Sequence, residues 1–225
     1  MSRQRKALVL DFDGLVADTE VLWLAVLRRL YRTYFQELPY ASVVESVGGT
    51  LHDFDPFTDL SARCGSVDAS ELEEQAEGLF RAWMAYEAPL PGVRRLIAEA
   101  RLRAVPLAIA SSSREASVVP YLDRFGLRDA FSVVVTADDV VRVKPAPDLY
   151  LLAARRLGTE PEHIVAFEDS GRGVRAAKAA GALCVAVPHV LTRSHDFDAA
   201  DIRLDSLALC DLEDLLSHDP GKVRR

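Results

Sequence analysis

The 225-residue sequence lacks any long apolar run and contains little cysteine. No apolar stretch approaches the ~20 residues that a helix needs to cross a bilayer, so the sequence does not indicate a membrane protein. The cysteines are odd in number and form no Cys-x-x-Cys pair, which argues against a disulfide framework and a zinc site. We therefore expect reduced thiols in a cytoplasmic protein; the three cysteines are Cys64, Cys184 and Cys210.

The chain also lacks an excess of positive charge. Its formal net charge is −7 and its pI is about 5.3, whereas nucleic-acid binders are more often basic. With 49% hydrophobic and 27% charged residues, it has the composition of a globular protein whose partner is a small molecule. No charge or apolar pattern indicates a dimer seam, so we expect a monomer that contacts neither nucleic acid nor membrane.

Compact apolar runs of strand length recur along the chain. The first, Ala7 to Leu10, follows a basic N-terminus but ends at Asp11, too early for the about 7–15 apolar residues of a secretory signal, so we interpret it as a strand. Continuous rather than alternating runs are typical of strands that are covered on both faces. We expect strands over residues 6–10, 105–110, 131–135, 163–167, 183–187 and 202–204.

Segments with apolar residues at three- and four-residue spacing alternate with these runs and predict helices. They cover residues 92–103, 114–125, 147–157 and 171–180. Alternating strands and helices predict an α/β fold, a doubly wound, Rossmann-like parallel sheet. The stretch from 15 to 89 breaks the rhythm, because it is mostly helical and too long for an ordinary crossover. We expect a core domain over 1–14 and 90–225, with an inserted α-helical domain over 15–89.

Three of the expected strands end in polar clusters. Ligands bind outside the carboxyl ends of strands in open parallel sheets, so these clusters are candidates for one crevice. Asp11 and Asp13 suit either a turn or a nucleophile with an acid/base partner. Converging carboxylates repel one another unless a cation is present, and Mg²⁺ prefers such oxygen ligands. The clusters are Asp11 with Asp13, Ser111 to Ser113, and Glu168 with Asp169 and Ser170.

The serines and one lysine complete the candidate site. A serine after the second strand suits a helix N-cap, and its hydroxyl, with helical backbone amides, also suits a phosphate oxygen. Lys144 lies in Val-Lys-Pro-Ala-Pro-Asp, in a chain whose 27 basic residues include only four lysines. A solvated loop is the ordinary place for a lysine, but Pro145 and Pro147 stiffen this one, and an ammonium can reach both a carboxylate and a phosphoryl oxygen.

Four motifs in order resemble the haloacid dehalogenase-like hydrolase superfamily, in the branch that holds β-phosphoglucomutase and small phosphatases. They are Asp11-Phe-Asp-Gly-Leu-Val-Ala-Asp-Thr-Glu20, Ser111 after an apolar strand, Lys144-Pro-Ala-Pro-Asp, and Glu168-Asp-Ser-Gly. The resemblance runs from Ala7 to about Leu215 and implies a Mg²⁺-dependent enzyme whose inserted helical segment is a cap that closes over the site.

The resemblance also implies roles for individual residues. Asp11 is the expected nucleophile, which forms an aspartyl-phosphate, and Asp13 is the expected general acid and base. Phosphoryl oxygens would be held by Ser111, Ser112 and Lys144. Mg²⁺ would be held by the Asp11 carboxylate, the Asp13 backbone carbonyl and the Asp169 carboxylate, with Glu168 in support.

Departures from the branch favour hydrolysis. Sugar-phosphate mutases of this branch carry a histidine where this chain has Trp23, and a cap arginine that is absent from the stretch 46–52. Dehalogenases lack an acid/base residue at the position of Asp13, and phosphonatases add a cap lysine, whereas residues 15–89 contain none. We expect a phosphatase for a small phosphorylated metabolite such as a sugar or polyol phosphate. The alternatives are a phosphosugar mutase and a non-catalytic sensor.

Overall fold

The computed structural model describes residues 6–46, 54–65 and 67–217. The chain divides into two compact units, Met1–Ala17 with Pro89–Arg225, and Asp18–Ala88. The first contains a parallel sheet, and the second is helical in its described residues. None of the helices in the described ranges has the length and apolarity to cross a membrane.

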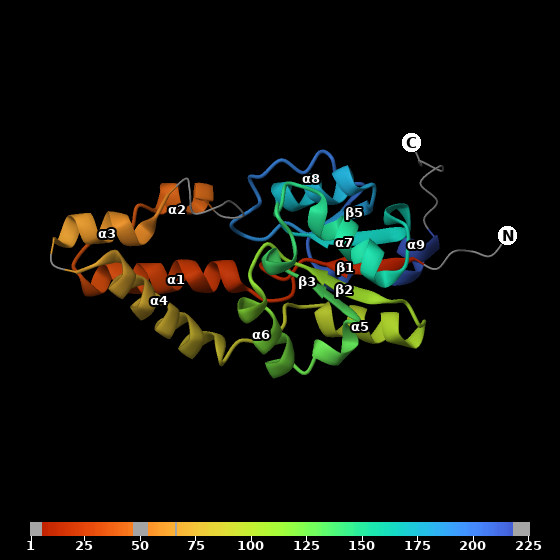
Figure 1. The fold of residues 1–225 in the computed structure, drawn as a ribbon, viewed down its shortest axis with the longest axis horizontal. Helices are drawn as coiled ribbons and strands as arrows, with labels where there is room; N and C mark the ends of the chain where they lie inside the picture. The colour runs from red at the N-terminus through yellow and green to blue at the C-terminus, as the bar shows by residue number, and fades with distance from the viewer. Residues whose placement is uncertain (1–5, 47–53, 66, 218–225) are drawn as a thin grey trace. The chain divides into compact units, whose positions relative to one another are not determined.

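The larger unit is built on a six-stranded parallel sheet with the strand order β3-β2-β1-β4-β5-β6 (Figure 1). This order, which reverses after β1, confirms the predicted doubly wound α/β fold. Leu10 at the end of β1 lies opposite Ile109 of β2 and Phe167 of β4, so the next residues of these strands end at one edge. The strands are β1 (Ala7–Leu10), β2 (Leu107–Ala110), β3 (Val133–Val135), β4 (Ile164–Glu168), β5 (Leu183–Ala186) and β6 (Ile202–Arg203).

Helices cover both faces of this sheet. Helices α7 and α8 pack against each other and over the strands on one face, and Figure 1 shows α5 and α6 on the opposite side. The helices of this unit are α5 (Val93–Leu102), α6 (Val119–Arg124), α7 (Asp148–Leu157), α8 (Gly171–Ala180) and α9 (Leu212–Ser217). Short 3-10 turns join them: η1 (Glu115–Ser117), η2 (Arg128–Ala130), η3 (Ala137–Asp139), η4 (Pro161–His163) and η5 (Leu207–Leu209).

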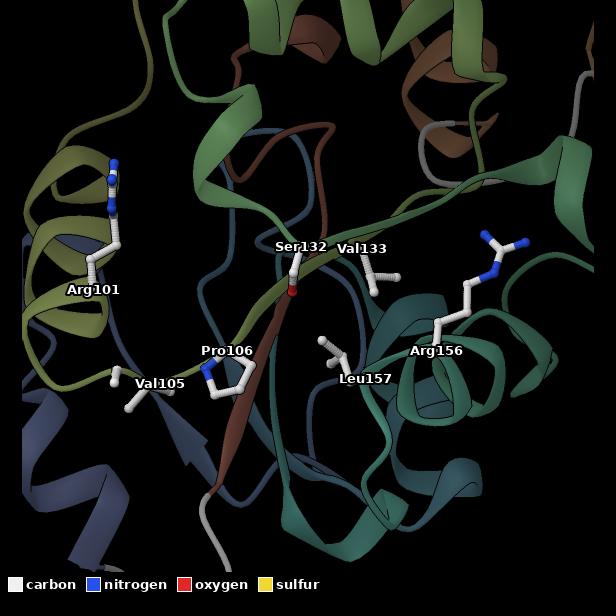
Figure 2. Close-up of a pocket in the computed structure, with 8 residues that line it drawn as sticks. Arg101, Val105, Pro106, Ser132, Val133, Arg156 and Leu157 are labelled. Carbon is white, nitrogen blue, oxygen red and sulfur yellow. The ribbon is translucent and has the colours of Figure 1, made fainter.

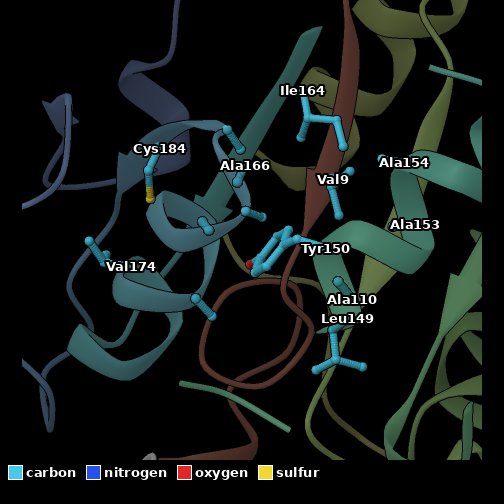
Figure 3. Packing of buried hydrophobic residues seen from close by; sticks show 14 of the residues in the cluster. Val9, Ala110, Leu149, Tyr150, Ala153, Ala154, Ile164, Ala166, Val174 and Cys184 are labelled. Atoms are coloured by element: carbon cyan, nitrogen blue, oxygen red, sulfur yellow. The ribbon is translucent and has the colours of Figure 1, made fainter. Parts of the chain in front are cut away.

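The core beneath α7 and α8 is rich in alanine. Small side chains let a helix approach a sheet closely, and each fully buried methylene still contributes about 0.8 kcal/mol. Tyr150 and Phe197 are the aromatic members of the cluster, and Figure 3 shows the ring of Tyr150 among its small residues. The alanines of the cluster are Ala108, Ala110, Ala153, Ala154, Ala166, Ala176, Ala177, Ala180, Ala182 and Ala186.

One expected helix is wrong in its details. Residues 114–125 form the turn η1 and the short helix α6 instead of one continuous helix. Pro120, near the start of α6, has no backbone N–H to donate to a preceding turn. The cap positions of η1 and α6 are Arg114 and Val118, and neither carries a capping side-chain bond. The expectation that a serine of 111–113 caps this helix is therefore wrong.

The smaller unit packs its helices around two aromatic side chains. The buried hydroxyl of Tyr31 donates to the carbonyl of Pro56 at 2.7 Å and to Asp59 at 2.8 Å. Trp23 meets Phe57 and Phe80 edge-on, at ring separations of 6.2 and 5.3 Å. The helices are α1 (Thr19–Thr33), α2 (Tyr40–Ser46), α3 (Pro56–Cys64) and α4 (Ala69–Met84).

Candidate active site

The first candidate residue, Asp11, follows β1 directly and is held by backbone on both sides. Its N–H donates to the carbonyl of Phe167 in β4 at 3.0 Å. Its carboxylate Oδ1 accepts the N–H of Phe12 at 2.7 Å. The side chain is almost fully buried. In the part of the chain that the structure describes, no donor occupies the second oxygen, Oδ2, so its lone pairs are available to a ligand.

Lys144 lies against this carboxylate. Its Nζ is 2.7 Å from Asp11 Oδ1 and 2.6 Å from Glu168 Oε1, and its side chain is 5% exposed. The backbone carbonyl of Lys144 accepts a bond from Arg172 at 3.1 Å, which fixes the loop to α8. A buried ammonium shared by two buried carboxylates offsets a charge that would otherwise be costly. The structure therefore brings Lys144 and Asp11 together.

Glu168 ends β4 and is fully buried. Its Oε1 also accepts the hydroxyl of Tyr150, which rises from α7 beneath it. A β-carbon at position 173 would lie 1.8 Å from Glu168 Oε2, so only glycine leaves room for this carboxylate beside α8. Glu168 thus holds Lys144 together with Asp11.

A second carboxylate, Asp169, approaches the same place. One carboxylate oxygen from each of Asp11, Glu168 and Asp169 lies within 4.8 Å of the others, and all three residues are buried. Gly14 permits this approach, because its φ is +73° and a β-carbon there would lie 2.3 Å from Asp169 Oδ2. The hydroxyl of Thr192 donates to the backbone carbonyl of Asp169 at 2.6 Å and anchors it from the far side. These hard oxygen donors suit a divalent cation.

Two hydroxyls of the serine run contact Asp13. The hydroxyls of Ser111 and Ser113 both donate to Asp13 Oδ2, at 3.0 and 2.7 Å. Ser112 is exposed, and its hydroxyl makes no hydrogen bond with any described residue. The structure therefore joins two of the three serines to the second aspartate of the first motif.

The electrostatics of the site follow from burial. Burial first, and the neighbouring Glu168 second, raise the pKa of Asp11 to about 7, although Lys144 acts in the opposite direction. Burial alone would lower the pKa of Lys144, but Asp11 and Glu168 outweigh it and raise that pKa, so the ammonium stays charged. Burial and Glu168 raise the pKa of Tyr150 well above its usual range, so the hydroxyl remains a donor.

A separate hollow lies at the opposite end of the strands. It has a volume of about 540 Å³ and opens next to the starts of β2 and β3, flanked by Arg101 and Arg156 (Figure 2). Arg156 is already committed to Asp139 at 2.6 Å and to the carbonyl of Val134 at 3.2 Å. Since ligands of such sheets bind at the carboxyl ends of strands, this hollow is not the candidate active site.

The match to a protein family covers most of the chain. Residues 8–187 match the sequence profile of the haloacid dehalogenase-like hydrolases. The chain belongs to this family. It is therefore a hydrolase, and its resemblance to the branch with β-phosphoglucomutase and small phosphatases is confirmed.

This haloacid dehalogenase-like hydrolase has relatives over almost its whole length. It is 42% identical to YhcW of Bacillus subtilis (strain 168) over 95% of this chain and 97% of that protein. It is 32% identical to hexitol phosphatase B of Escherichia coli (strain K12), over 95% and 98% of the two chains. The crystal structure of CbbY from Rhodobacter sphaeroides in complex with phosphate matches with a TM-score of 0.74 and 31% identity, covering 92% of this chain and 96% of that one.

The sequence does not predict some of the residues that contact this site. Tyr150 looks like an ordinary helical core residue, and only the packing of α7 over β4 brings it to Glu168. Thr192 and Arg172 act on backbone carbonyls, for which a sequence carries no signal. The serine run includes Ser113, but the resemblance implies Ser112 for the site, because three consecutive serines cannot be told apart before the turn is known.

Proposed function

We propose that this hydrolase is a Mg²⁺-dependent phosphatase that cleaves a phosphorylated sugar or polyol through an aspartyl-phosphate at Asp11. One observation carries the proposal: a buried Asp11 is paired with a buried lysine at 2.7 Å, and Asp13 stands two residues away. Covalent catalysis needs a carboxylate with an available oxygen, and phosphoryl transfer needs positive charge where the equatorial oxygens gather. The pair supplies both.

Mg²⁺ fits the donor set. Two buried carboxylates, Asp11 and Asp169, leave positions for water and substrate phosphate, as this ion prefers. Glu168 lies within the same cluster, but its Oε1 already binds Lys144 and Tyr150 and its Oε2 lies beside Gly173 of α8, so we propose it as a support. The Asp13 backbone carbonyl is the third protein ligand in this proposal. The ion would neutralise charge on the phosphoryl group and on the carboxylates around it.

The chain's own residues then carry two half-reactions. Asp11 attacks phosphorus through one carboxylate oxygen, the ester P–O bond breaks, and Asp13 gives a proton to the departing alkoxide. A water molecule next attacks the aspartyl-phosphate, Asp13 takes the proton from that water, and the P–O bond to Asp11 breaks. Inorganic phosphate leaves, and both aspartates return to their starting state.

Positive charge and hydrogen-bond donors hold the phosphoryl group during both steps. Lys144 contributes an ammonium and Ser111 a hydroxyl. Ser112, which is exposed at the same turn, is the other proposed phosphoryl ligand. Removing one donor of this kind from an enzyme costs about 10²–10³ in kcat. This is the size of effect that each phosphoryl ligand should have here.

The segment over residues 15–89 is proposed as the cap domain that excludes water and reads the leaving group. A sugar or polyol phosphate is the proposed substrate class, because hexitol phosphatase B is similar over nearly the full length of both chains. Residues 47–52 of the stretch that lacks the mutase arginine lie outside the described residues. A small-molecule partner, a cytoplasmic location and a monomeric state complete the proposal; the three cysteines are free thiols, as a reducing compartment requires.

Hydrolysis is favoured over phosphosugar isomerisation by the position of Trp23. Where mutases of this branch are expected to carry a histidine, this indole packs edge-on against Phe57 and Phe80 within the helical unit. An indole N–H cannot shuttle a proton as an imidazole does. The packing of Trp23 therefore supports hydrolysis, in which the leaving group departs, over isomerisation, in which it is held for a second phosphoryl transfer.

The test is phosphate release from a panel of sugar and polyol phosphates, measured with Mg²⁺ and with chelator. We expect Mg²⁺-dependent release, strongest for one group of these esters. The same panel with a sugar bisphosphate present tests the mutase. Isomer formation without phosphate release would contradict the proposed hydrolysis.

A further inference from the structure

The side chain of Asp13 is fixed through one oxygen by two hydroxyls. Ser113 Oγ lies 2.7 Å from Asp13 Oδ2, and Ser111 Oγ lies 3.0 Å from the same atom. Hydrogen bonds from two donors to one carboxylate oxygen set the rotation of the carboxylate plane, and so they also set the direction of its other oxygen.

The turn that carries Ser113 is itself anchored. The N–H of Ser113 donates to Ser111 Oγ at 2.9 Å, and the carbonyl of Ser113 accepts the N–H of Ala137 in η3 at 2.9 Å. The N–H of Glu115 donates to the Asp138 carboxylate at 2.9 Å, so the residues that follow Ser113 are also bound to η3. The hydroxyl of Ser113 therefore stands on backbone that two neighbouring connections hold in place.

The two serines are not equivalent, because each hydroxyl has a single proton to donate. In the proposed reaction the hydroxyl of Ser111 donates its hydrogen bond to a phosphoryl oxygen, and its bond to Asp13 is then lost. Ser113 remains as the hydroxyl that donates to Asp13 Oδ2. Its bond is also the shorter of the two.

We infer that Ser113 is a positioning residue that keeps Asp13 aimed at the leaving oxygen and then at the attacking water. This inference rests on the proposed function, since it assigns Ser113 a part in the acid/base work of Asp13. Ser113 itself touches neither phosphorus nor the leaving group in this account. Acid/base catalysis contributes about 10²–10⁴ to a rate, and a less well oriented carboxylate forfeits part of that.

Substrates with different leaving groups distinguish this positioning role of Ser113 from other roles. An alkoxide needs a proton in order to leave, whereas 4-nitrophenolate leaves without one. Loss of the Ser113 hydroxyl should therefore slow transfer from an alkyl phosphate and spare transfer from 4-nitrophenyl phosphate. Hydrolysis of the aspartyl-phosphate should slow for both esters, because the attacking water needs Asp13 as a base.

The experiment compares Ser113→Val with Ser113→Thr, two side chains of nearly equal shape that differ in the hydroxyl. We expect Ser113→Val to lower kcat for a hexitol phosphate at least about tenfold with KM within about twofold. With 4-nitrophenyl phosphate it should keep the wild-type rate of the initial nitrophenolate burst, followed by a slower steady state. Ser113→Thr should restore both, and Ser117→Ala, at an exposed serine of the same connection, should behave as wild type.

Several outcomes would overturn the inference. A burst slowed as much as the alkyl reaction would make Ser113 a phosphoryl ligand instead. Equal activity of the Val and Thr variants would mean that the hydroxyl has no role, and equal loss in both, with a matching loss in thermal stability, would mean a purely structural one. A wild-type protein that releases no phosphate would contradict the proposed function itself, whereas wild-type turnover with an unchanged Ser113→Val variant contradicts only the role of Ser113.

Discussion

The ammonium of Lys144 lies 2.7 Å from Oδ1 of Asp11, and neither side chain is more than 8% exposed. The two residues are 133 positions apart, and the sheet brings them together because Asp11 directly follows β1 while the loop before α7 returns to the same edge. Glu168 completes a buried arrangement of one cation and two anions. In the proposed mechanism, stability and chemistry therefore depend on the same three side chains.

Replacing Lys144 by Met should lower both the free energy of unfolding and turnover. The variant leaves two buried carboxylates without their cation, and breaking a buried pair costs about 3–5 kcal/mol of unfolding free energy. Turnover should fall by at least about 10². Lys178→Met is the control, because its contact with Asp201 at 2.7 Å is only partly buried and should be worth at most about 1 kcal/mol. Urea unfolding and phosphate release measure the two effects, and equal losses in both variants would contradict the account.

Gly14→Ala should weaken Mg²⁺ activation specifically. The new β-carbon would meet Asp169 Oδ2 at 2.3 Å, and the φ of +73° adds about 1–2 kcal/mol of backbone strain. Gly126→Ala carries the same strain at a φ of +66° but meets nothing within 4 Å. We expect Gly14→Ala to be destabilised at least as much as Gly126→Ala, and a raised Mg²⁺ requirement only at position 14. A Mg²⁺ titration of activity that gives wild-type values for Gly14→Ala would be evidence against Asp169 as a ligand.

Two buried tyrosines allow a matched comparison. Tyr150→Phe removes a donor from Glu168, and Tyr31→Phe removes one from Pro56 and Asp59 in the helical unit. Each loss leaves a buried acceptor short of a partner and should cost about 1–3 kcal/mol. Turnover should fall only in Tyr150→Phe, because Glu168 also holds Lys144. Chemical unfolding and kcat separate the effects; a fall in turnover in both variants would argue that stability alone is responsible.

The metal-free protein should lose stability as pH rises from about 4 to about 7. Burial first and Glu168 second raise the pKa of Asp11 from 3.8 to about 7, so across this range the folded chain keeps a proton that the unfolded chain has released. Stability linked to such a group falls with rising pH. Asp11→Asn should remove this contribution, and urea unfolding in chelator at several pH values would show it as the difference between the two proteins. Parallel pH profiles would contradict the raised pKa.

Much of the larger unit could be predicted because its strands are continuous apolar runs between helical segments. The expected strand 105–110 corresponds to β2, Leu107–Ala110, and the expected helix 171–180 corresponds to α8, Gly171–Ala180. The smaller unit was harder. Helices α2 and α3 are too short for a clear periodic pattern, although Asp55, whose side chain accepts the N–H of Phe57, and Pro56 form a usual helix start.

The site was predictable where a polar residue follows a strand, and not where packing decides. Asp11, Ser111 and Glu168 come directly from the pattern of strand ends. The choice between Ser112 and Ser113 depends on a turn closed by the Ser113 N–H, and no residue type signals that turn. Tyr150 depends on how α7 lies over the alanine-rich face of the sheet, which is a property of the assembled core.

Trapping the phosphoenzyme tests the central claim most directly. Protein quenched with acid during turnover of a hexitol phosphate is reduced with borohydride, which converts an aspartyl-phosphate to homoserine, and the modified position is then located by peptide mass spectrometry. We predict homoserine at position 11 alone, present only with Mg²⁺ and substrate, and an Asp11→Asn variant that is folded but inactive. Modification at another carboxylate, or turnover by Asp11→Asn close to that of the wild type, would contradict the account.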